Sequence, residues 1–191
     1  MIEEARRMSI LGILISALLQ HFSPSSVEGV VVRAGTSQTI ARAEVQLHAT
    51  SRSEALVFST GADGKFEFRN IPPGAYRLSV SRNGYLGSVY GQRGRAGAGT
   101  ALVVEAGQTR KNIRLAMVAS GVISGRVYDS NGEPEANVAV LALKYSYLDG
   151  RRTLTPVKTD QTDDRGEYRM FWLPPGHYYI PPRRSAPNRG I

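Results

Sequence analysis

The chain contains one sequence pattern twice. Residues 62–78 read ADGKFEFRNIPPGAYRL and residues 164–180 read DRGEYRMFWLPPGHYYI, so that Gly64, Phe66 and the Pro72-Pro73-Gly74 motif have counterparts 102 residues later. A repeat of this length is the size of a small domain rather than of a solenoid unit. The repeat therefore predicts two related domains in tandem.

Two earlier segments recur at slightly different separations. Residues 28–31 match residues 124–127 at a separation of 96, and residues 43–47 match residues 136–140 at a separation of 93. The order of the segments is the same in both copies. We interpret the changing separation as loops of different length between the same strands.

After Ser26 the apolar residues alternate with polar ones, which is the period of a half-buried strand. Seven short segments of the first copy follow this pattern: Val27–Arg33, Ala43–Ala49, Leu56–Thr60, Lys65–Arg69, Ala75–Ser81, Ala101–Glu105 and Lys111–Met117. No segment predicts a helix there. Seven short strands in about 90 residues are typical of a β-sandwich.

Two turns separate the strands around the repeated motif. Asp63-Gly64 is typical of a tight hairpin turn, since both residues tolerate a positive φ. Pro72-Pro73-Gly74 predicts a chain reversal in which Gly74 takes the left-handed conformation. Because the motif consists of conformational residues, we interpret it as a turn of the fold rather than as a ligand loop.

The combined pattern resembles the carboxypeptidase regulatory-like domain, a transthyretin-like β-sandwich. It comprises Val-x-Gly-x-Val near the start, Ala-x-Val-x-Leu, then Asp-Gly-x-Phe-x-Phe-x-x-Ile-Pro-Pro-Gly-x-Tyr-x-Leu-x-Val and Gly84-Tyr85. The resemblance implies a fold and little about activity, because such domains accompany peptidases, glycosidases and outer-membrane receptors. The pattern is also similar, more distantly, to collagen-adhesin B-type repeats. Residues 28–33 contain no lysine for the isopeptide crosslink found in relatives of those repeats.

We therefore predict an all-β chain of two tandem Ig-like or transthyretin-like antiparallel β-sandwiches after an N-terminal signal helix. The expected domains are residues 27–117 and, as an incomplete second copy, residues 121–182. Counterparts of the last two strands of the first copy would lie beyond residue 191. Residues 183–191 are expected to be a disordered basic tail.

The first 25 residues differ from the rest of the chain. Arg6 and Arg7 precede an apolar run over Met8–Leu19, which is shorter than the roughly 20 residues that span a bilayer and is typical of a secretory signal. We expect residues 1–25 to be a signal peptide, cleaved after Ser25. A first helix of a cytosolic domain and an uncleaved membrane anchor remain alternatives. The predicted location is secreted, periplasmic or at the cell envelope.

The charge balance is basic, with a net charge of +8. Such a charge attracts nucleic acid or anionic surfaces. No nucleic-acid motif accompanies it, so we expect a solvated basic surface and no nucleic-acid partner. The chain has no cysteine, which excludes disulfides and thiol chemistry.

No set of residues predicts catalysis, a cofactor or a metal. The histidines are His21, His48 and His177, at positions that are not equivalent in the two copies, and zinc sites need three or four ligands. The one acidic cluster, Asp160, Asp163, Asp164 and Glu167, lacks the spacing of a calcium loop. We predict that the protein is not an enzyme.

Exposed aromatic residues are the remaining candidates for a binding site. Aromatic faces commonly hold sugars and peptides in β-sandwich modules. The weak ligand-binding candidates are Tyr85, Tyr90, Arg93, Tyr145 and Tyr147. The predicted function is a non-catalytic binding or spacer module for carbohydrate or an envelope protein. The alternative is an accessory part of a larger enzyme or outer-membrane receptor.

Overall fold

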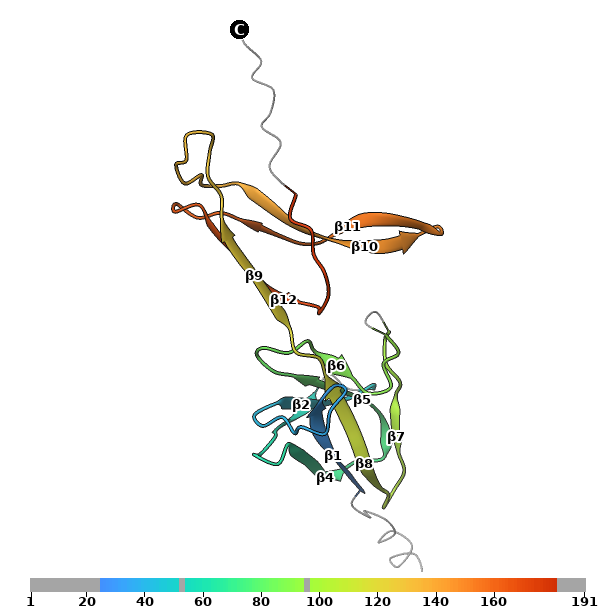
Figure 1. Cartoon of the computed structure of the whole chain (residues 1–191). Coiled ribbons are helices and arrows are strands. Elements are labelled where there is room, and N and C mark those ends of the chain that lie inside the picture. The colour runs from blue at the N-terminus through green and yellow to red at the C-terminus, as the bar shows by residue number, and fades with distance from the viewer. Residues whose placement is uncertain (1–24, 52–53, 95–96, 182–191) are drawn as a thin grey trace, which may run out of the picture. The chain divides into compact units, whose positions relative to one another are not determined.

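The computed structural model describes residues 25–51, 54–94 and 97–181 (Figure 1). These residues form two compact units. Unit 1 takes the chain up to Arg82 together with Gly87–Met117, and unit 2 takes Asn83–Leu86 and the chain from Val118 onward. The predicted signal peptide, except Ser25, and the predicted tail lie outside the described residues. Among the described residues there is no helix, and therefore none long and apolar enough to cross a membrane.

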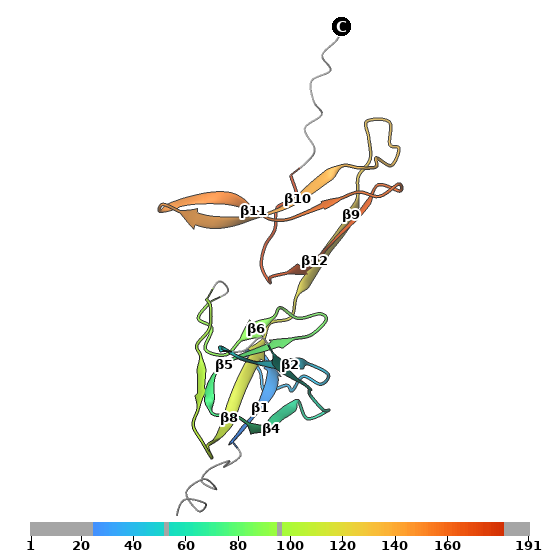
Figure 2. The ribbon, with the colours of Figure 1, turned by 180° about the vertical axis from the view of Figure 1, so that it is seen from behind.

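Unit 1 consists of two β-sheets (Figures 1 and 2). One sheet has the order β4 (Lys65–Ile71), β1 (Ser25–Arg33), β8 (Thr109–Met117). The other joins β3 (Ala55–Ser59), β2 (Glu44–Ala49) and β5 (Gly74–Ser81), and both β6 (Ser88–Val89) and β7 (Leu102–Val104) pair with β5. All seven predicted strands are confirmed, and the two-residue β6 is an addition. The predicted hairpin at Asp63-Gly64 is wrong: Gly64 has the expected positive φ, but the turn connects β3 and β4, which belong to different sheets.

The prediction of a purely antiparallel sandwich is wrong for one ladder. β1 pairs with β8 in parallel, with Val31 opposite Leu115, while β1 and β4 are antiparallel. The reason lies in the connection, since β7 pairs with β5 in one sheet and the chain then enters the other sheet as β8. Alternation along a strand specifies its faces and not the direction of its neighbour.

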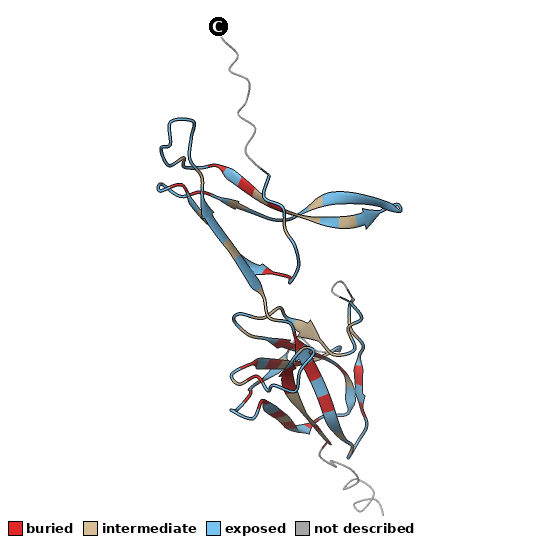
Figure 3. Ribbon diagram, viewed as in Figure 1, coloured by how far each residue is buried: buried red, intermediate tan, exposed pale blue. Residues whose placement is uncertain are grey.

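The core of unit 1 is formed by the inward positions of these strands. Val31 of β1, Phe66 of β4 and Leu115 of β8 are buried, as are Leu47 and Leu78 of the opposite sheet. Figure 3 shows the buried positions concentrated on these strands. Burial of a side chain of this size contributes about 1.5–3 kcal/mol. The positions that the alternation predicted to face inward are thus buried in the structure.

The described part of unit 2 has four strands in two separate two-stranded sheets. β9 (Gly121–Arg126) pairs with β12 (Glu167–Leu173), and β10 (Ala139–Leu148) pairs with β11 (Arg151–Gln161), both antiparallel. A small core packs between them, formed by Val140, Ala142, Met170 and Leu173. The chain also forms one bridge between Leu143 and Tyr179, which is the counterpart of the pairing of His48 with Arg77 in unit 1.

Hydrogen bonds confirm that the two units repeat one local structure. The buried hydroxyl of Thr60 accepts from the Ala43 backbone N–H at 2.9 Å and donates to the Ile40 carbonyl at 2.8 Å. Thr162 makes the same pair of bonds, to the N–H of Val138 at 2.9 Å and to the carbonyl of Glu135 at 2.7 Å.

These bonds correct the matching of the second segment. Ala43 corresponds to Val138, a separation of 95, whereas the sequence comparison paired Ala43 with Ala136. A shift of two residues leaves the same side chains on the same face of a strand. The alternation of apolar and polar residues therefore cannot reveal a shift of two residues.

The prediction for Gly74 is also wrong. Gly74 pairs with Val104 of β7 as an extended strand residue, and the residue with a positive φ of 55° is Asn70, before the prolines. In unit 2 the counterpart of Asn70 is Trp172, at a φ of 62°. The motif still reverses the chain, and in both units a tyrosine hydroxyl (Tyr76 or Tyr178) donates to the carbonyl of the first proline, at 2.6 Å.

Candidate functional site

The hairpin of β10 and β11 carries the largest group of exposed aromatic and basic side chains in unit 2. Its strands have 10 and 11 residues, against 6 and 5 in the matching β2 and β3, so the hairpin extends beyond the small core. Asp149 and Gly150 form its two-residue turn with φ values of 49° and 75°. Two successive positive φ values define the type I′ turn that suits the twist of a hairpin.

Tyr145 is held in place on this hairpin by two neighbours. Its ring meets the ring of Tyr179 edge to face at 5.0 Å between centroids, and the Arg152 guanidinium carbon lies 3.7 Å from its ring centre. Aromatic pairs and cation–π contacts of this kind each stabilise by about 0.5–1.5 kcal/mol. Tyr145 therefore presents a fixed ring that is still 38% exposed.

Tyr147 lies two residues further along β10, and it is 78% exposed. Alternate residues of a strand share a face, so Tyr145 and Tyr147 face the same side of the hairpin. Arg152 is paired opposite Tyr147, and Arg151 follows at the turn. Among the described residues neither arginine forms an ion pair. Arg151 pairs with Leu148 and therefore faces the other side of the hairpin. We define Tyr145, Tyr147, Arg152 and Tyr179 as the hairpin surface.

The other predicted candidates do not join this surface. Tyr85 is half-buried and bridges to Ala119 within unit 2. Tyr90 is half-buried in unit 1, where its N–H donates to the Leu78 carbonyl at 2.9 Å, and Arg93 is exposed in the following loop. The structure gives these three residues no shared site.

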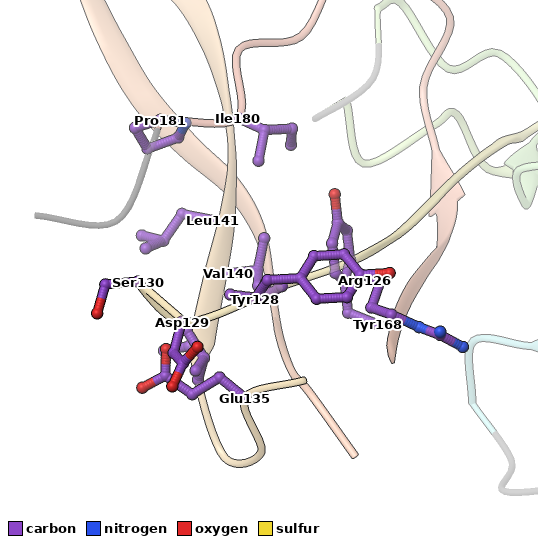
Figure 4. A pocket seen from close by; sticks show the side chains of 13 residues that line it. Arg126, Tyr128, Asp129, Ser130, Glu135, Val140, Leu141, Tyr168, Ile180 and Pro181 are labelled. Carbon is purple, nitrogen blue, oxygen red and sulfur yellow. The ribbon is translucent and has the colours of Figure 1, made fainter. Parts of the chain in front are cut away.

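Unit 2 also contains a cavity of about 890 Å³ beside the end of β9 (Figure 4). Its apolar lining includes Tyr128, Val140, Tyr168 and Ile180, and its polar lining includes Arg126, Asp129 and Glu135. Arg126 donates to the Glu167 carboxylate and to the Tyr128 side chain, which raises the pKa of the guanidinium further above its usual value. This cavity was not predicted from the sequence, because Tyr128, Val140 and Tyr168 match the core residues Val32, Val45 and Phe66 of the first copy.

The carboxylates of the acidic cluster bind other groups of the protein, mostly backbone N–H groups. Asp163 accepts the N–H groups of Arg165 and Glu167 at 2.9 and 2.8 Å, closing the turn that Asp63 closes in unit 1. Asp160 accepts the N–H of Arg169 at 2.8 Å, and Glu167 pairs with Arg126. Among the described residues there is no group of three or more acidic or histidine side chains that could hold a metal ion.

Sequence reasoning missed Arg152 and Tyr179, which hold Tyr145, and the exposed Phe171 and Trp172 of β12. Tyr179 is far from Tyr145 along the chain, and only the bridge to Leu143 brings it near. The sequence shows a tyrosine next to the repeated Tyr178. It does not show that this tyrosine, Tyr179, contacts Tyr145 on the hairpin.

Residues 26–118 match the family model of the carboxypeptidase regulatory-like domain. This confirms the resemblance for the first copy. The match does not include the predicted second copy at residues 121–182. No curated protein matches the chain.

Several solved structures are distantly similar. A streptococcal ancillary pilin is 15% identical with a TM-score of 0.43, over 83% of this chain and 53% of the pilin. The minor pilin of Streptococcus agalactiae is 15% identical with a TM-score of 0.40, over 85% and 84%. The Bacillus anthracis TIE protein is 17% identical with a TM-score of 0.39, over 81% and 28%. The chain thus spans about half of the first structure and less than a third of the last.

Proposed function

We propose that this protein is a non-catalytic binding module of the cell envelope or the secreted fraction, and that its hairpin surface binds carbohydrate. The observation that carries the proposal is the fixed ring of Tyr145 beside the freely exposed ring of Tyr147. Flat aromatic rings stack on the C–H faces of sugars without losing much side-chain entropy. The apolar run over Met8–Leu19, outside the described residues, supports export.

The charge of Arg152 favours an acidic polysaccharide. Arg152 shares the face of Tyr147 and is stacked over the Tyr145 ring, which also faces solvent. A guanidinium can bind a carboxylate in a bidentate manner. A uronate-containing chain would therefore stack on Tyr147 and bind Arg152 at the same time.

Affinity electrophoresis of the full chain in gels that contain a neutral or a uronate-rich polysaccharide tests this function. We expect retardation by the acidic polymer, and a loss of affinity of about tenfold for Tyr147→Ala, equivalent to about 1.4 kcal/mol. Tyr128→Ala is the matched control, since this tyrosine is exposed but lies off the hairpin. Equal retardation of all three proteins, or none, would contradict the proposal.

A further inference from the structure

β3 is an edge strand of unit 1 that lacks the usual protection against pairing with another strand. Among the described residues it pairs with β2 alone, and its sequence, Ala-Leu-Val-Phe-Ser, has neither a charged residue nor a proline. Soluble proteins commonly blunt their edge strands with charges, prolines or short length. Leu56 is 46% exposed and Val57 is 58% exposed, so this edge presents aliphatic side chains to solvent.

The other strands in the described part of the chain carry such protection. Every other strand of five or more residues contains at least one charged residue, and β6 and β7 have only two and three residues. β11, the counterpart of β3 in unit 2, contains both Pro156 and Lys158. The absence of these features from β3 is typical of an edge that binds a further strand.

The backbone groups available for such pairing belong to the odd-numbered residues of β3. The Thr60 N–H donates to the Ala43 carbonyl at 2.9 Å, on the side of β2. Because N–H and C=O groups alternate in direction along a strand, those of Ala55, Val57 and Ser59 face the open edge. A further strand would therefore form its hydrogen bonds with these residues.

We propose that β3 is a dimerisation edge, to which a second copy of this chain adds its own β3 in antiparallel orientation. A two-fold axis through Val57 pairs every residue of the strand, with Val57 opposite Val57 of the second copy. Leu56 then lies opposite Phe58, and Ala55 opposite Ser59. An axis through a neighbouring residue would leave one end of each strand unpaired. Pairs of aliphatic and aromatic side chains directly opposite each other stabilise antiparallel sheets.

This register also covers the exposed inner side chains of the strand. Leu56 and Phe58 lie opposite Leu47 and Val45 of β2, which are buried, so both face the inner side of the sheet. Phe58 is half-buried and contacts Phe68 edge to face, with 6.1 Å between ring centroids. In the dimer, Phe58 of the second copy would cover the exposed part of Leu56.

The charges beside the two ends of β3 complement each other in this orientation. At the start of the strand, Glu54 and Arg69 line a cavity of about 290 Å³. At its end, Asp63 and Lys65 line a cavity of about 750 Å³. Antiparallel pairing brings the start of one β3 beside the end of the other, so each copy contributes one acid and one base at each end. Among the described residues Glu54 forms no ion pair, which leaves it available to Lys65 of the second copy.

The small size of the edge predicts a weak dimer. A stable interface buries about 800 Å² per partner, with about 20 residues on each side, and β3 has five residues. We therefore expect a dissociation constant of about 10–100 µM, so that the chain is a monomer when dilute and a dimer when concentrated.

Sedimentation velocity of the full chain at concentrations from about 1 µM to about 1 mM tests the proposal. We expect the weight-average mass to rise from that of one chain to that of two. Val57→Lys should weaken association at least about 100-fold, because two lysines would meet at the two-fold axis. Val103→Lys is the matched control, since Val103 is 56% exposed on β7 and lies outside the proposed contact. A monomer at every concentration, or a dimer that Val57→Lys leaves unchanged, would overturn the proposal.

Amide hydrogen exchange of the unsubstituted chain locates the contact without any variant. The amides of Ala55, Val57 and Ser59 should exchange fast in dilute protein and become protected as the concentration rises. Protection of these amides at every concentration would overturn the proposal, because another segment of the same chain would then cover the edge. Association without any protection of β3 would also overturn it.

Discussion

The four strands described in unit 2 have counterparts among the eight strands of unit 1, yet the two units differ in how completely they bury them. Phe66 in unit 1 is 1% exposed, whereas its counterpart Tyr168 is half-buried beside a cavity. The local signals that form the strands are nearly the same in both. Among the described residues β1 has two neighbouring strands and β9 has one, so the same local strand pattern occurs both with and without a closed core.

The largest expected effect is that of Phe66→Ala, which should destabilise unit 1 by about 3–5 kcal/mol because it leaves a cavity in a closed core. Tyr168→Ala should cost about 1–2 kcal/mol, since the site is already open. Urea unfolding followed by far-ultraviolet circular dichroism measures both. Trp172 is the only tryptophan, and it lies in unit 2. The midpoint of the urea unfolding transition followed by its fluorescence should therefore be the same with and without Phe66→Ala. Equal losses of stability in Phe66→Ala and Tyr168→Ala would contradict this difference between the units.

Gly64→Val should destabilise unit 1 by about 1–3 kcal/mol. Gly64 has a φ of 70°, and a Cβ there would lie 2.8 Å from the Val31 carbonyl oxygen. Gly74→Val is the matched control, because Gly74 is extended and a Cβ would meet only Tyr76, at 3.7 Å. We expect a change in thermal midpoint for the first variant and little for the second. A reversed order would show that Gly74, rather than Asn70, requires the left-handed conformation.

Thr60→Val and Thr162→Val should each cost about 1–2 kcal/mol, because a buried N–H loses its acceptor in both units. Thr→Ser retains the hydroxyl and should retain most of the stability. Denaturant unfolding of the Val and Ser variants at Thr60 and Thr162 measures whether this hydroxyl contributes the same free energy of unfolding in both units. A cost confined to Thr60→Val would mean that unit 2 admits water at this position.

The smallest expected effect is a pH dependence of two turns. The backbone N–H groups of Glu133 and Asn131 lower the pKa of Asp129, and that of Lys65 lowers the pKa of Asp63. A carboxyl whose folded pKa lies below its unfolded value of 3.8 stabilises the fold above that value. This stabilisation is lost as the pH falls from about 4 through the folded pKa. Both side chains are exposed, so the effect is small. Titration of the Asp129 carboxyl by NMR checks it, and a pKa at or above 3.8 would contradict it.

Much of the fold could be predicted from the sequence, because alternation and turn residues act locally. The strand around Phe66 and the turn at Gly64 need only neighbouring residues, although the two strands that this turn connects lie in different sheets. The exposure of Tyr147 was predictable for the same reason. The fixed ring of Tyr145 was not, since Tyr179 reaches it only through a pairing across the fold.

The sequence by itself determined that the chain is all-β and where the strands of the first copy lie. Only the tertiary structure decided that β1 and β8 are parallel and that Val138 matches Ala43. The physical reason is that a strand pattern defines two faces, whereas direction, register and the number of neighbours depend on backbone hydrogen bonds between residues far apart in the chain.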